Sequence, residues 1–237
     1  MDLIEIVAII TTGIGIGFSM MGISIAVLYS PFIISIFGGS LGNGIMIFPF
    51  LVSDFYMIYR NRKFLNWKIV LKLLPSSILG LIIASIIANK ITDEEFRIAI
   101  GLIIFIVSIL YFSKKYSSNL KKFGWIFGVF GAIASYLGNV SGPIFNIYFL
   151  SFRNDTKTYV GTRDLFFGVL NFLKFFIYLF VFKNINSFTF YRGLLAIPFV
   201  FIGGFLGKII ITKVNQKTFN LIVVYLGLLV SIKLLFF

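Results

Sequence analysis

Long apolar blocks separated by short polar joins run along the whole chain. At least six of these blocks have 17 or more residues, and about 20 apolar residues in a helix cross the ~30 Å hydrocarbon layer of a membrane. Three blocks, 24–37, 124–138 and 143–152, are too short to cross alone, since ten residues make about 15 Å of helix. The pattern predicts an all-α polytopic membrane protein. The blocks are 3–21, 24–37, 41–59, 69–89, 96–113, 124–138, 143–152, 161–182, 192–212 and 218–237.

The composition excludes a water-soluble globule. Hydrophobic residues make up 59% of the chain and charged residues 12%, about half of the ~25% charged residues of a soluble domain. No long polar segment remains for an extramembrane domain. We therefore expect a single transmembrane domain over residues 1–237.

The missing residue types exclude several kinds of chemistry. The chain has no Cys and no His, which removes disulfides, thiolate nucleophiles, His zinc ligands and Ser-His or Cys-His catalysis. We expect no metal and no cofactor. The net charge of +13 comes from basic residues in short loops rather than on one face or arm, so it predicts membrane topology and no nucleic-acid partner.

The second half of the chain repeats features of the first. Gly131, Ser135 and Gly138 each follow Gly15, Ser19 and Gly22 by 116 positions. A second offset, of 123 positions, relates Pro198, Gly203, Lys213, Phe219 and Ser231 to Pro75, Gly80, Lys90, Phe96 and Ser108. The matches predict a duplication, with repeat 1 at about 3–113, repeat 2 at about 124–237, and a cytoplasmic linker at 114–123.

Basic residues distinguish two topologies. If the short blocks fuse into eight plain spans, the loops divide the basic residues 12 against 8. If each half instead opens with a re-entrant pair of short helices followed by three spans, the division is 15 against 5, with Lys174 inside the membrane. The positive-inside rule favours the second topology, with both termini outside. Each repeat then crosses an odd number of times, so the repeats are inverted, as in many transporters.

The segment 138–143 indicates a break between two short helices. Ser141 is a candidate N-cap, and Pro143 falls just inside the next helix, where its missing N–H costs nothing. The free N–H groups at such a helix start attract anions. Asn139 and Ser141 add polar side chains, and Gly142 permits close approach to the backbone. The alternative is a Pro/Gly kink in a buried helix.

The block 161–182 carries polar residues on one helical face. Asn171, Lys174 and Tyr178 have the spacing i, i+3 and i+7. A lysine at the centre of a membrane helix costs at least ~2.5 kcal/mol and by default marks a functional pathway. We expect Lys174 either to line that pathway or to pair with Asp54, an acid within the predicted span 41–59.

Gly161 and Thr162 open the same block. Thr162 is a candidate cap, and the N–H groups that follow it can also face an anion. Ordinary capping at the membrane surface is the alternative.

The second half also resembles a known family. It carries in order Gly138-Asn139-Val140-Ser141-Gly142-Pro143-Ile144-Phe145-Asn146-Ile147-Tyr148-Phe149-Leu150, Tyr159-Val160-Gly161-Thr162, Phe166-Phe167, Asn171-Phe172-Leu173-Lys174 and Tyr178. These runs are similar to the signature of the TauE/SafE membrane proteins, grouped as sulfite exporters and permeases for sulfonates and related anions. The resemblance covers the whole chain and is most specific from 131 to 178. It implies transport of a small sulfur oxyanion and family-typical roles for Asn139, Gly142, Pro143, Gly161, Thr162, Asn171 and Lys174.

The first half departs from the family pattern. A Gly-rich run followed by Pro is usual in the opening helix of the family, whereas this chain has Met21-Gly22-Ile23-Ser24-Ile25-Ala26 followed by Pro31. Ser24 is the candidate site residue of this stretch.

Together these features predict a transporter for sulfite or an organosulfonate in a bacterial-type inner membrane. Moving one negative charge outward across an inside-negative membrane gains about 2.3 kcal/mol per 100 mV, so the predicted export needs no coupled ion. The expected partners are the anionic solute and lipid. The sequence leaves open whether the protein forms a homodimer.

Three other functions remain at this point. One is a permease for another small anion, or for a cation or neutral solute held by Asp54. Another is a non-transporting membrane subunit. The third is an enzyme, for which Ser141 with Lys174 would form the one imaginable Ser–Lys dyad; we expect no enzymatic activity.

Overall fold

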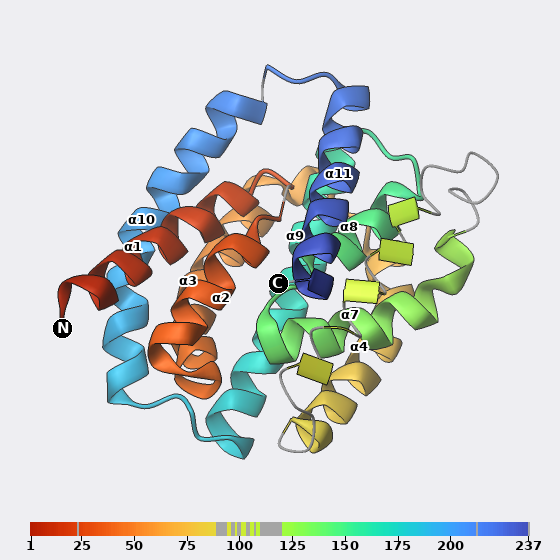
Figure 1. Ribbon diagram of the computed structural model, residues 1–237. Helices are drawn as coiled ribbons and strands as arrows, with labels where there is room; N and C mark the ends of the chain where they lie inside the picture. The colour runs from red at the N-terminus through yellow and green to blue at the C-terminus, as the bar shows by residue number, and fades with distance from the viewer. Residues whose placement is uncertain are drawn as a thin grey trace.

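Helices and turns make up the described part of the chain, and no strand occurs there. The computed structural model describes residues 1–22, 24–88, 94–95, 98, 101–102, 105–106, 108–109, 120–211 and 213–236 (Figure 1). The predicted all-helical class is confirmed. The expected span 96–113, the expected linker 114–123, and Lys90 and Phe96 of the second set of repeat matches lie wholly or largely outside the described residues. The elements are α1 (Leu3–Ser19), α2 (Ala26–Phe37), α3 (Gly39–Arg60), η1 (Arg62–Phe64), α4 (Trp67–Ile87), η2 (Leu120–Phe123), α7 (Gly124–Gly138), α8 (Gly142–Leu150), α9 (Thr156–Phe176), η3 (Ile177–Val181), α10 (Ser187–Ile211) and α11 (Gln216–Phe236).

Four of the described helices are long and apolar enough to cross a membrane. They are α3, α4, α9 continued through the π-helical turn η3, and α10. Many of their large apolar side chains are exposed, among them Phe55, Leu71 and Phe205. In water such a surface would be costly, but in a bilayer it faces acyl chains. The chain is an integral membrane protein.

The start of α9 differs from the expected one. This helix begins at Thr156, because the Asp155 carboxylate accepts hydrogen bonds from the backbone N–H groups of Lys157 and Thr158 at 3.0 and 3.1 Å. The same carboxylate accepts a bond from the Thr158 hydroxyl, which lowers the pKa of Asp155 below its ordinary value. The prediction that Thr162 caps the helix is wrong. Its hydroxyl lies one and a half turns inside and accepts from the Asn66 N–H at 3.2 Å.

Two tight breaks lie between short helices. α7 ends at Gly138 because Asn139 adopts a left-handed conformation with φ of 53°, and α8 begins at Gly142. In the first half, α1 ends at Ser19 and α2 begins at Ala26, with Gly22 at φ 89° between them. α8 has nine residues, or about 14 Å of helix.

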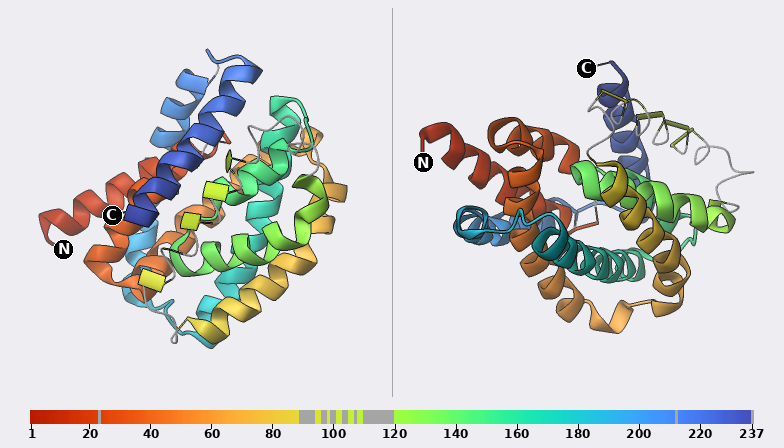
Figure 2. Two further views of the ribbon diagram at one scale, coloured as in Figure 1. Left: turned by 45° about the vertical axis from the view of Figure 1, so that its right-hand side comes forward. Right: turned by 90° about the horizontal axis from the view of Figure 1, so that it is seen from below.

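Small residues let two pairs of helices pack closely. Gly17 of α1 lies against the backbone of Val200 in α10, and Gly203 of α10 lies against Ile14. On the opposite side of the molecule, Gly80 of α4 lies against Val129 of α7 (Figures 1 and 2). Such stripes of glycine bring membrane helices into van der Waals contact. Each close pair joins a short helix of one half to a long helix of the other.

Contacts along these pairs fix the helix directions. α1 and α10 run the same way, since Glu5 pairs with Arg192 at one end and Gly17 meets Val200 further along. α4 and α7 also run the same way, with Ser76 next to Gly128 and Gly80 next to Ala132.

The central pair, α3 and α9, runs in opposite directions. Asn61 at the end of α3 donates to Asp164 near the start of α9, at 3.3 Å. Asn184, just beyond η3, donates to the Ser40 carbonyl at the start of α3, at 3.1 Å. The break after α7 contacts both of these helices, through Asn43 of α3 and Lys174 of α9.

Candidate functional site

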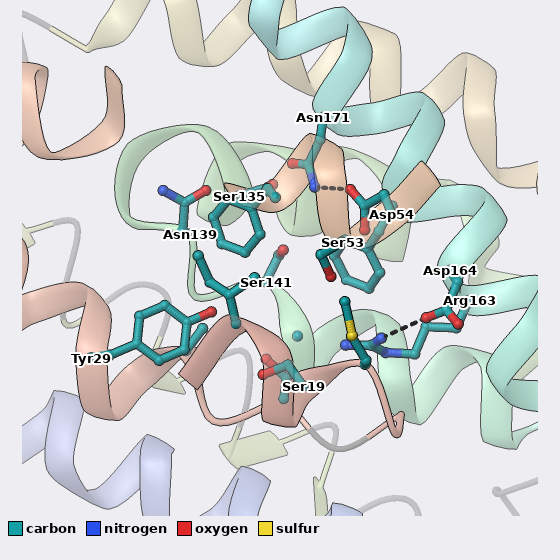
Figure 3. A pocket seen from close by; sticks show the side chains of 17 residues that line it. Ser19, Tyr29, Ser53, Asp54, Ser135, Asn139, Ser141, Arg163, Asp164 and Asn171 are labelled. Atoms are coloured by element: carbon teal, nitrogen blue, oxygen red, sulfur yellow. Dashed lines mark hydrogen bonds and ion pairs between the residues drawn. The ribbon is translucent and has the colours of Figure 1, made fainter. Parts of the chain in front are cut away.

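A polar cavity lies where the two breaks meet the central helices. Its volume is about 40 Å³. Phe50, Phe167, Ile16 and Met20 form apolar parts of its wall. Figure 3 shows polar side chains converging on it from α1, α2, α3, α7, the break after α7, and α9. The polar lining residues are Ser19, Ser24, Tyr29, Ser53, Asp54, Ser135, Asn139, Ser141, Arg163, Asp164 and Asn171.

The break after α7 is held by a hydrogen-bond network. The Lys174 ammonium donates to Asn139 Oδ1 at 2.6 Å and to the Ser135 carbonyl at 3.1 Å. Asn139 Nδ2 in turn donates to Asn43 Oδ1 at 2.7 Å. Lys174 is 1% exposed and is not among the lining residues. It therefore fixes Asn139, which lines the cavity, and places its positive charge on the far side of Asn139 from the cavity.

Arg163 brings a second positive charge directly to the cavity wall. Its Nε donates to Asn146 Oδ1 at 2.8 Å, and its Nη1 pairs with Asp164 Oδ1 at 3.1 Å. The guanidinium lies 4.7 Å from the Phe167 ring centroid. Within the described residues no hydrogen bond engages Nη2. This arrangement orients a rigid fork of donors next to the cavity.

Asp54 is hydrogen-bonded to an amide rather than to a cation. Asn171 Nδ2 donates to Asp54 Oδ2 at 2.7 Å. The ion pairs found among the described residues are Arg163–Asp164 and Arg192–Glu5, so the pair between Asp54 and Lys174 that the sequence left open does not form. Asp54 instead occupies the cavity wall beside Asn171 (Figure 3).

Several hydroxyl groups around the cavity lack protein partners. The Tyr29 hydroxyl is buried and has no hydrogen bond within the described part of the chain, and it points into the cavity (Figure 3). Ser53, Ser135 and Ser141 likewise direct hydroxyls to this region without a protein hydrogen bond in the described structure. Buried polar groups normally have partners, so this set is available to a polar solute.

The two breaks are in direct contact. Ser24, in the turn between α1 and α2, lies so close to Gly142 that a side chain at position 142 would overlap it. The Ser30 hydroxyl donates to the Gly138 carbonyl, and the Tyr159 hydroxyl donates to the Gly22 carbonyl at 3.1 Å. The start of α8 therefore faces the cavity next to the first-half turn.

Six of the candidate residues from the sequence line the cavity and five do not. Ser24, Asp54, Asn139, Ser141, Gly142 and Asn171 line it. Pro143 lies in the first turn of α8, Gly161 packs against Phe64, and the Tyr178 hydroxyl donates to the Tyr136 carbonyl at 2.9 Å. Thr162 contacts Asn66, and Lys174 reaches the cavity through Asn139. Ser141 occupies the N-cap position of α8, but its side chain makes no capping bond.

The sequence interpretation missed Arg163, Asp164 and Tyr29. Arg163 is one of the 15 basic residues that the favoured topology places on one face, because it lies at the start of the expected block 161–182. A helix that starts at Thr156 places Arg163, Phe167, Asn171 and Lys174 on one stripe, at spacings of four, four and three residues. That spacing could have identified Arg163. Tyr29 lies in an apolar block without any such signal.

The arrangement is suited to binding a small anion. The guanidinium of Arg163, the amide of Asn139, several hydroxyls and the N-terminus of α8 supply hydrogen-bond donors. No group of three or more His, Cys, Asp or Glu side chains that could hold a metal occurs among the described residues.

Comparison with known proteins gives one match. The family model described as Sulfite exporter TauE/SafE matches residues 7–234 of this chain. No curated protein matches it, and no solved structure does.

Proposed function

We propose that this chain, which belongs to the TauE/SafE sulfite exporter family, exports sulfite or a small organosulfonate. The anion would pass through the cavity between the two helix breaks. The family is one of membrane transporters for sulfur anions. The observation that supports this site best is Arg163, a buried guanidinium on the wall of a cavity rich in unpaired hydroxyls.

The donors around the cavity match the acceptors of a sulfonate-type group. Such a group presents oxygen atoms only, and every one of them accepts hydrogen bonds. Arg163, Asn139, Ser141 and Tyr29 bring donors from three different helices or turns. The start of α8 adds the positive end of a helix dipole, as in transporters whose short helices point at an anionic substrate.

The cavity size supports a small substrate. A space of roughly 10–15 Å³ on this measure is needed for one water molecule, so about 40 Å³ accommodates only a few non-hydrogen atoms. Sulfite has four such atoms and methanesulfonate five. An arenesulfonate does not fit without movement of the helices.

Equivalent contacts in the two halves support an inverted duplication. Tyr29 packs on Gly15 within the first pair of short helices, and Phe145 packs on Gly131 within the second. Both members of one contact are 116 positions from those of the other. α3 and α9, the third described α-helix of each half, run in opposite directions, as inverted repeats require.

The basic residues support an orientation in a bacterial inner membrane. Arg60, Lys63 and Lys208 lie at the end of the molecule where α3 and α10 finish, which we assign to the cytoplasm. Both termini then lie outside, and the two pairs of short helices enter from opposite sides of the membrane.

Flux measurements on reconstituted protein test the site. Liposomes that contain the full chain should release [35S]sulfite, and Arg163→Gln should slow this release at least tenfold, since charge-assisted hydrogen bonds contribute about 1.5–3 kcal/mol. Arg62→Gln removes an exposed arginine and should leave the rate unchanged.

Arg163→Lys separates a binding defect from misfolding. It keeps the charge beside Asp164 but loses the guanidinium fork, so it should fold and still transport slowly. Wild-type rates in both Arg163 variants would overturn the site, and absence of flux in the wild type would overturn the function.

A further inference from the structure

The buried charges around the cavity cancel. Arg163 and Lys174 are 6% and 1% exposed, and Asp54 and Asp164 are 9% and 3% exposed. Two positive and two negative groups make a site with no net charge when all four are ionised. An anion entering such a site meets two carboxylates as well as two cations.

Two of the four charges pair with each other, and the other two have only neutral hydrogen-bond partners. Asp164 pairs with Arg163 and accepts a second hydrogen bond from Asn61. Lys174 is held by the Ser135 carbonyl and Asn139. Asp54 has one neutral donor, Asn171, and its Oδ1 accepts no hydrogen bond from any described residue.

Apart from the four groups named above, the elements around Asp54 bring no charged side chain to it. Arg163, Asp164 and Lys174 face it from α9, and Tyr29 faces it from α2. The lining residues from α1, α7 and α8 are apolar or neutral. The segment of α10 that packs along α3, from Gly193 to Phe201, has no ionisable side chain. Asp54 is thus the one acid at the cavity without a cationic partner.

We propose that Asp54 takes up one proton when the anion binds, so that one singly charged sulfonate-type anion and one proton cross the membrane together. This inference rests on the proposed function, because it concerns the same cavity. With a proton on Asp54 the four groups carry a net charge of +1, which complements one negative charge on the solute. The proton leaves Asp54 on the side where the anion leaves.

Coupling of this kind changes the driving force. The sequence alone predicts uncoupled efflux, because an inside-negative membrane potential favours outward movement of an anion and the predicted spans offer few proton carriers. One anion with one proton carries no net charge, so the membrane potential does no work on the pair. If binding takes up one proton, the affinity for the anion falls tenfold per pH unit above the pH range in which Asp54 of the empty protein titrates.

Methanesulfonate is the probe that tests the coupling, because it keeps a single negative charge at every pH used. Wild-type protein in liposomes is given a methanesulfonate gradient, with a pH-sensitive dye inside and a potassium diffusion potential imposed. We expect one proton to move per anion. The final accumulation ratio should not change with the potential, whereas an uncoupled monoanion changes its ratio about 50-fold per 100 mV.

Asp54→Asn provides the matched variant. It has the same shape as protonated Asp54, and its side-chain oxygen still accepts from Asn171, so we expect a folded protein. Its methanesulfonate flux should move no protons and should follow the potential. Asp2→Asn changes an exposed acid at the start of α1 and should behave as the wild type.

The outcomes separate the coupling from the function. Wild-type flux without proton movement and with the 50-fold potential dependence would overturn the coupling and leave the proposed function intact. Sulfite flux without methanesulfonate flux would also leave the function intact, but it would contradict a singly charged sulfonate-type substrate. Absence of flux for both anions would overturn both proposals.

Discussion

Two buried tyrosines close to the cavity differ in the state of their hydroxyls. The Tyr178 hydroxyl donates to a backbone carbonyl, whereas the Tyr29 hydroxyl has no partner in the described structure. We expect Tyr29→Phe to leave thermal stability unchanged and to weaken sulfite binding by about two- to tenfold, the contribution of one hydrogen bond. Tyr178→Phe should do the opposite and lower the free energy of unfolding by about 1 kcal/mol.

Unfolding curves and binding titrations in detergent measure both effects. A loss of stability in Tyr29→Phe with unchanged binding would assign this tyrosine to packing alone.

Lys174 offers a second comparison at the residue scale. Lys174→Met keeps the length of the side chain but removes the donor that fixes Asn139 and one positive charge. We expect sulfite flux to fall at least tenfold. Lys183→Met removes an exposed lysine just beyond η3 and should have no effect. Equal flux in both variants would show that the charge behind Asn139 is irrelevant to transport.

Local sequence signals identified part of the site. Lys174 and Asn171 were predictable because a polar residue within an apolar span is costly and needs a reason. Asn139 and Gly142 were predictable from the Gly/Ser/Pro pattern of a helix break. Arg163 shares their helical stripe but was missed, because Asp155 starts α9 one and a half turns earlier than the apolar pattern does.

At the scale of elements, the contact between the two breaks determines how α8 faces the cavity. A methyl group at Gly142 would overlap Ser24. Gly142→Ala should therefore lower stability by about 1–3 kcal/mol, as overpacking does, and should slow sulfite flux. Adding Ser24→Gly removes the overlapping atoms and should restore most of the stability.

Thermal unfolding of the single and double variants measures this coupling. If Ser24→Gly does not rescue Gly142→Ala, the two breaks do not meet as described.

The apolar blocks predict where the helices lie, but they predict the helix ends less accurately. The block 124–138 coincides with α7, and 24–37 differs from α2 by two residues at its start. The largest differences are at α9 and α10, which each begin five residues early. Their first turns are polar and amphipathic, so hydropathy alone cannot mark them.

For the whole molecule, the opposite entry of the two short-helix pairs is the main prediction of topology. The chain has no cysteine, so each introduced one is a unique label site. Leu3→Cys at the start of α1 should react with an impermeant maleimide on intact cells. Lys122→Cys, just before α7, should react only after the cells are permeabilised.

Equal reactivity of Leu3→Cys and Lys122→Cys on intact cells would contradict inverted repeats. Ser187→Cys at the start of α10 serves as a second outside marker and should behave as Leu3→Cys does.

The cavity itself could not be read from local patterns. Its central hydrogen bond joins Asp54 to Asn171, which are 117 positions apart in the sequence. The contact of Ser24 with Gly142 also joins residues from the two halves of the chain. These contacts depend on how α3 and α9 cross. The proposed duplication predicts that the two halves meet, but not which side chains meet.

The most direct test of the anion site is anomalous diffraction from crystals of the full chain grown with selenite, which has the shape and charge of sulfite. We predict a selenium peak inside the cavity, within hydrogen-bond distance of Arg163 and the Tyr29 hydroxyl. Selenium peaks confined to the surface, in protein that transports sulfite in liposomes, would contradict the site.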